Sequence, residues 1–158
     1  MPDYTEQINM ASTTEELHSP VIDNDDVIIV NVEMRDFTFG AAFNTIIGVV
    51  GDKNSEIVSF KINRLIDGHD ISECAEHKLF WRNVDTKKED AVALDVKISE
   101  DDEETVMLGW LIKEDVTEAP GKIEFALQIS DFDTEGKTIY EWNTKKGTGL
   151  TVEAGFNN

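Results

Sequence analysis

The side chains that could carry out acid–base or nucleophilic chemistry are few in this sequence. Its three histidines are His18, His69 and His77. A nucleophile needs a neighbouring base, and no histidine accompanies a Gly-x-Ser-x-Gly elbow or a comparable motif. His69 stands in a Gly-containing turn sequence, where a polar residue more often hydrogen-bonds its own backbone than a ligand. Phosphate-cradling Gly-rich loops are also missing. We therefore predict no catalytic residues and no cofactor.

Two acidic runs could supply ligands for calcium, because hard cations bind several carboxylate or carbonyl oxygens from one loop. The run at 131–136 matches the first half of a calcium loop, but Trp142 occupies the position of the required bidentate glutamate. The run at 100–104 lacks both glycine and ligand spacing. A hairpin turn and a solvated connection between strands are the favoured interpretations, so we predict no metal site.

Aromatic residues offer a different chemistry, the stacking of sugars. Trp81, Trp110 and Trp142 could form such a platform if at least two rings were exposed on one face. Each lies within an alternating apolar pattern, which favours a place in the core. Cys74 is the only cysteine and cannot form an internal disulfide, so we expect it to be a small buried hydrophobe.

Charge restricts the partners of this chain. Its 158 residues contain 33 Asp and Glu against 14 Lys and Arg, a formal net charge of −19. Such a field repels phosphate backbones and anionic headgroups, so we expect neither nucleic acid nor membrane as a partner. No window of about twenty apolar residues exists. Residues 1–9 lack the basic and apolar regions of a signal peptide.

The sequence predicts that the elements which position these residues are strands. Apolar residues alternate from Val27 onward, most clearly at 122–129, where every second side chain from Ile123 is apolar. The expected strands are 27–34, 43–50, 56–62, 77–84, 92–98, 105–112, 122–129, 137–142 and 150–152. Apolar residues on both faces make 105–112 a candidate central strand. We predict one all-β domain over 27–158, an Ig-like or related antiparallel β-sandwich of about eight to nine strands.

Residues 1–26 have a different composition. They are polar and acidic, with isolated apolar side chains at Tyr4, Ile8, Met10 and Leu17. This composition does not support a core, so we predict an extended acidic N-terminal arm. The four apolar side chains are the candidate assembly interface.

Several pieces of the sequence resemble a domain found in phages and prophages of Gram-positive bacteria, over about the last two-thirds of the chain. The pieces are GDKNSE at 51–56, DGHDISEC at 67–74, DDE at 101–103, WLI at 110–112, YEWNT at 140–144 and GFNN at 155–158. The resemblance is to the N-terminal domain of baseplate upper proteins or fibre-like proteins. It implies a structural role in the virion and provides no catalytic residues.

The leading hypothesis is therefore a non-enzymatic virion structural protein of the baseplate or tail, of a head fibre or of capsid decoration. It would dock on other virion proteins through its arm and self-associate as a homo-oligomer. It would be made in the bacterial cytoplasm and located in the virion. The alternative is a carbohydrate-binding module for attachment to the host surface, in which case exposed aromatic side chains would bind a glycan.

Overall fold

The structure is a computed structural model that describes residues 26–156. The candidate anchors Tyr4, Ile8, Met10 and Leu17, and His18 with them, lie outside the described residues. The described part is almost entirely β-structure, with thirteen strands numbered β2 to β14 and one short 3-10 helix, η1.

Five strands form the first sheet, in the order β10, β11, β5, β2, β3. Their bounds are Ile28–Asn31 for β2, Asp36–Phe39 for β3, Glu56–Asn63 for β5, Asp95–Ile98 for β10 and Thr105–Ile112 for β11. Neighbours are antiparallel except β2 and β5, which run parallel.

Six strands form the second sheet, in which β12 is the central element. The bounds are Ile46–Val49 for β4, Glu76–Asn83 for β8, Glu89–Ala93 for β9, Gly121–Phe132 for β12, Thr138–Asn143 for β13 and Gly147–Glu153 for β14. One edge of β12 pairs with β8, and the other pairs first with β14 and then with β13. At the sheet edges, β9 pairs with β8, and β4 pairs in parallel with β14.

A small hairpin closes one end of the structure. It consists of β6 (Leu65–Ile66) and β7 (His69–Asp70), followed by η1 (Ile71–Glu73). Asp67 and Gly68 between the strands have φ angles of 53° and 81°. Positive φ at both central residues is the requirement of a type I′ turn, for which Asp-Gly is a preferred sequence.

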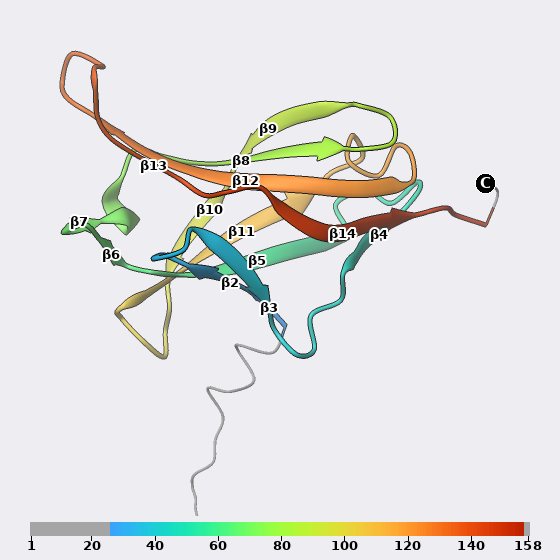
Figure 1. Cartoon of the computed structure of the whole chain (residues 1–158), viewed down its shortest axis with the longest axis horizontal. Coiled ribbons are helices and arrows are strands. Elements are labelled where there is room, and N and C mark those ends of the chain that lie inside the picture. The colour runs from blue at the N-terminus through green and yellow to red at the C-terminus, as the bar shows by residue number, and fades with distance from the viewer. Residues whose placement is uncertain (1–25, 157–158) are drawn as a thin grey trace, which may run out of the picture.

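The two large sheets face each other and enclose the core (Figure 1). Alternation places one face of each strand inside, as the regular burial along β11 and β12 shows. Between the sheets, the ring of Phe125 lies 4.7 Å from that of Phe37 and 5.9 Å from that of Phe60, centroid to centroid. A side chain at Gly147 would overlap the rings of Phe125 and Phe37, so glycine there allows this packing.

The structure confirms the all-β class and the two-sheet arrangement, and it differs from the expected strands in three places. The segment 92–98 is not one strand, because the chain leaves the second sheet after β9 and enters the first at β10, with buried Leu94 at the change. Strand β3 and the hairpin of β6 and β7 were not expected. Thirteen strands therefore replace the expected eight to nine.

Trp110 provides a test of which residues form the core. It is 1 % exposed and belongs to the same cluster as Phe125, as its alternation predicted. Replacing Trp110 by Ala should lower the free energy of unfolding by about 3–5 kcal/mol. Ile57→Ala is the control, because Ile57 lies on a neighbouring strand but is 64 % exposed. Urea denaturation measures both variants, and a Trp110→Ala midpoint equal to that of the parent would contradict the assignment of Trp110 to the core.

Candidate interaction surface

The two described histidines make structural contacts. His77 is buried, and its Nε2 lies 2.6 Å from the carbonyl oxygen of Ile71 in η1. His69 lies directly after the type I′ turn, and its ring stacks on Tyr140 of β13 with centroids 3.9 Å apart. These contacts fasten the small hairpin to the second sheet. The structure thus brings His69 and His77 to the same end of the molecule but into separate contacts.

Both acidic runs form connections between strands, as interpreted from the sequence. Asp133 Oδ1 accepts hydrogen bonds from the backbone N–H groups of Glu135 and Lys137, which shapes the turn between β12 and β13. Asp102 accepts from the N–H of Glu104 and the hydroxyl of Thr105, and these bonds lower the pKa of its carboxyl group. Among residues 26–156, no cluster of three or more His, Cys, Asp or Glu side chains could hold a metal ion.

The three tryptophans are core residues. Trp81, Trp110 and Trp142 are each at most 3 % exposed. Trp142 is covered by the guanidinium group of Arg35, which lies 5.3 Å from its ring centroid. A sugar platform made of tryptophans is therefore excluded.

One aromatic side chain does reach the outer face of the second sheet. Phe80 of β8 is 40 % exposed and stands directly opposite Ala91 of β9 and Ala126 of β12. Paired residues of neighbouring strands share a face, so the ring has only a methyl group on either side. We call these three residues the Phe80 stripe.

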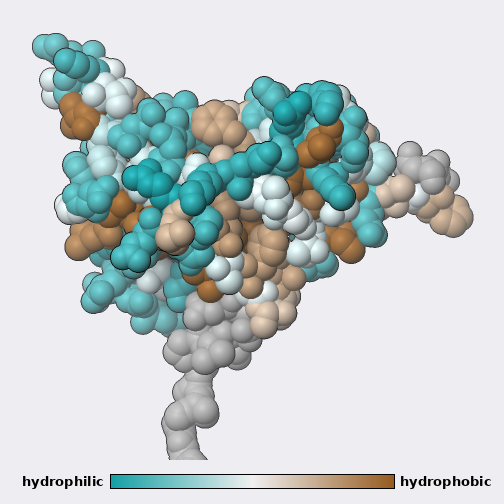
Figure 2. Space-filling view, viewed as in Figure 1, coloured by the Kyte–Doolittle hydropathy of each residue, from teal (hydrophilic) through white to brown (hydrophobic). Residues whose placement is uncertain are grey.

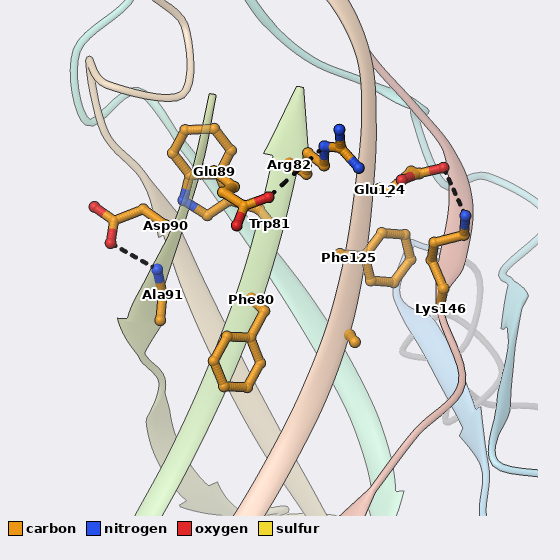
Figure 3. A pocket seen from close by; sticks show the side chains of 10 residues that line it. Phe80, Trp81, Arg82, Glu89, Asp90, Ala91, Glu124, Phe125 and Lys146 are labelled. Atoms are coloured by element: carbon orange, nitrogen blue, oxygen red, sulfur yellow. Dashed lines mark hydrogen bonds and ion pairs between the residues drawn. The ribbon is translucent and has the colours of Figure 1, made fainter. Parts of the chain in front are cut away.

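A row of charged side chains borders the Phe80 stripe on one side (Figure 3). Arg82 Nε lies 3.7 Å from a carboxylate oxygen of Glu89, and Lys146 Nζ lies 3.0 Å from a carboxylate oxygen of Glu124. Because Glu89 and Glu124 flank Arg82 on the adjacent strands, negative and positive groups alternate across the sheet. We call Glu89, Arg82, Glu124 and Lys146 the charged row.

A second polar row borders the stripe on its other side. Lys78 of β8 stands between Ala93 and Gln128, and Gln128 is paired with Asn143 of β13. The amide nitrogen of Gln128 donates to Asn143 Oδ1 at 3.0 Å. The ammonium group of Lys78 lies 3.2 Å from a carboxylate oxygen of Glu76. We call Lys78, Gln128 and Asn143 the amide row.

Side chains cap backbone groups on β9 and β4, two of the edge strands of the second sheet. On β9, the Asp90 carboxylate accepts from the N–H of Ala91. On β4, the side chains of Asn44 and Asp52 accept from the N–H groups of Ile46 and Val49. Occupied donors and acidic side chains discourage the addition of a further strand. The outer face of this sheet is therefore better suited to contacts than its edges at β9 and β4.

Other exposed apolar side chains lie away from the Phe80 stripe. Ile57 of β5 is 64 % exposed on the outer face of the first sheet, where it pairs with Leu111. Leu65 of β6 and Ile139 of β13 are 65 % and 60 % exposed. Figure 2 likewise shows a mostly hydrophilic surface with hydrophobic residues in several separate places.

The Phe80 stripe was missed at the sequence level, although one signal was present. Phe80 and Trp81 are adjacent in an expected strand, and adjacent residues of a strand point to opposite faces. One of the two rings therefore had to leave the core if the sheet has one solvent face. Because the apolar alternation places Trp81 in the core, Phe80 is the ring that points outward. Its neighbours Ala91 and Ala126 depend on the pairing of β8 with β9 and β12, which a single sequence does not show.

Comparison with known proteins adds no relative. No protein-family model matches the chain, and no curated protein matches it either. In the described part, no helix is long and apolar enough to cross a membrane.

Cys74 follows η1 and provides a test of burial at the end of the molecule where His69 and His77 lie. The thiol is free and buried, and burial raises its pKa, with Asp131 and Asp70 adding to the effect. A higher pKa leaves less of the reactive thiolate at any given pH. We expect a disulfide reagent to react with Cys74 slowly at pH 8 in the native protein and quickly in urea. Equal rates in both conditions would show that the thiol is accessible.

Proposed function

We propose that this chain is a non-enzymatic structural protein of a bacteriophage particle, a component of the baseplate or tail, of a head fibre or of capsid decoration. It docks on other virion proteins, self-assembles as a homo-oligomer and is located in the virion. The sandwich is Ig-like or of a related, mostly antiparallel type in which β2–β5 and β4–β14 are the parallel pairs. The sequence pieces that resemble the phage domain support this proposal, and the surface of the described residues supports it independently.

The observation that carries an assembly role is the separation of the exposed apolar side chains. Ile57 lies near the start of β5, whereas Leu65 follows the end of the same strand. Eight residues of chain, extended except for a bend at Arg64, separate them by up to about 25 Å at roughly 3.3 Å per residue. Isolated exposed apolar residues are common, but side chains exposed by 64 % and 65 % at opposite ends of one strand suit a subunit with a neighbour on each side.

Contacts through faces and ends also fit the capped edges of the second sheet. Because Ala91, Ile46 and Val49 have their N–H groups bound to side chains, edge-to-edge pairing at β9 and β4 would first break these bonds. A particle protein needs a fixed number of neighbours rather than open-ended strand addition. The bound N–H groups at β9 and β4 favour a fixed number of neighbours.

The arm, residues 1–26, is the proposed anchor to the particle. A truncation tests this role. Deleting 1–26 should leave a folded β-domain, because the core cluster lies entirely at or after Ile28. The same deletion should abolish incorporation into particles. A thermal melt of the truncated protein and its copy number on purified virions measure the two effects. Normal incorporation of truncated subunits would assign docking to the sandwich surface instead.

Salt provides the test of self-assembly. With a net charge of −19, free subunits repel one another at low ionic strength. Screening shortens the Debye length to about 8 Å near physiological ionic strength, so added salt should strengthen association. Light scattering across a salt series measures the change. Association that weakens with salt would show that attraction between unlike charges dominates.

A further inference from the structure

We propose that the hollow around Phe80 on the outer face of the second sheet binds a neutral saccharide. The sugar ring stacks on the exposed phenyl face, and its hydroxyl groups bond to the charged row. This site does not depend on the assembly role, because it uses a different surface from Ile57, Leu65 and the arm.

The floor of the hollow has the form that stacking requires. A pyranose ring has one face lined with C–H groups, which an aromatic face attracts through its negative quadrupole. Ala91 and Ala126 leave the Phe80 ring accessible from both sides, since neither side chain extends beyond a methyl group. The hollow measures about 450 Å³, within the roughly 300–1,000 Å³ of small-molecule sites.

The rim supplies hydrogen-bonding groups of both kinds. Arg82 and Lys146 are donors, and Glu89 and Glu124 are acceptors. A hydroxyl group both donates and accepts, so one sugar can bond to neighbouring members of the charged row. Both ion pairs can remain intact when a neutral polyol binds between them.

Charge selects against anionic ligands. Glu89 and Glu124 stand beside the two bases Arg82 and Lys146 at the hollow, so the charged row carries no net positive charge. Each of these bases is already paired with a carboxylate. An anion would have to displace a glutamate and approach a chain of net charge −19, whereas a neutral sugar meets neither obstacle.

A flat protein surface fits the same hollow poorly. The ion pair of Arg82 and Glu89 has side chains 45 % and 71 % exposed, and Lys146 of the other pair is 63 % exposed. A broad partner would remove all of these charges from water, which costs more than the ion pairs return. A single sugar ring covers Phe80 and leaves the outer parts of the charged side chains hydrated.

The experiment is a titration of the ¹⁵N-labelled full chain with methyl glucoside, N-acetylglucosamine, galactose and rhamnose, followed by NMR. The expected result is that at least one sugar shifts the amide signals of Phe80, Ala91 and Ala126. Phe80→Ala should weaken that binding by about tenfold or more, and Phe80→Tyr should keep it within about threefold. Ile57→Ala is the matched control and should bind as the parent does, because it removes an exposed apolar side chain from the opposite sheet.

Methyl glucuronide tests the role of charge, because it carries a carboxylate where methyl glucoside has a hydroxymethyl group. It should bind more weakly than the glucoside where the glucoside binds. The proposal is overturned if no sugar shifts the signals of the stripe, if Phe80→Ala binds like the parent, or if the glucuronide binds more tightly. Shifts at the stripe that appear on concentrating the protein alone would identify a contact between copies of this chain and would also overturn it. A full-length chain that binds sugar but is absent from purified virions would refute only the assembly role.

Discussion

The contact of Phe125 with Phe37 and Phe60 is the interaction on which the rest of this structure depends. Phe125 belongs to β12, and the other two rings come from strands of the opposite sheet. These rings set the separation of the sheets and thereby the burial of the surrounding aliphatic side chains. The contact depends in turn on Gly147, where any side chain would meet two of the rings. A backbone position in β14 therefore limits how closely the sheets can pack.

The alternation of side chains along β12 links that contact to the composition of the outer surface. Because side chains alternate along it, burial of Phe125 forces Glu124 and Ala126 outward. Pairing with β8 does the same for Phe80 and Arg82, whose inward neighbour is Trp81. The Phe80 stripe and the charged row are thus the outward half of the pattern whose inward half builds the core. A one-residue change of register would exchange the two halves.

The local pattern of apolar residues was sufficient to predict the most regular strands. It was insufficient where the position of a strand depends on which other strand it pairs with. The strand 105–112 was predicted with its observed bounds, and the Asp67–Gly68 turn follows from residues that adopt positive φ. By contrast, 92–98 has an unbroken apolar alternation although the chain changes sheets at Leu94, because both sheets bury the same kind of side chain. Strand β3 was missed because its Phe37 and Phe39 are only partly buried at an edge. The Phe80 stripe was missed for a related reason: Ala91 and Ala126 come from strands whose pairing with β8 a single sequence does not show.

The hairpin of β12 and β13 rises away from the small β6–β7 hairpin at the left of Figure 1, and its far end is organised by very few groups. Asp133 shapes the turn almost alone, and the first ring contact below it is that of Tyr140 with His69. Residues 133–139 are all exposed, so the core has no contact that depends on the length of this turn. Doubling a loop costs only about 0.6 kcal/mol in closure entropy. The tip is therefore a place where a foreign peptide can be inserted and displayed without altering the register of the sheet.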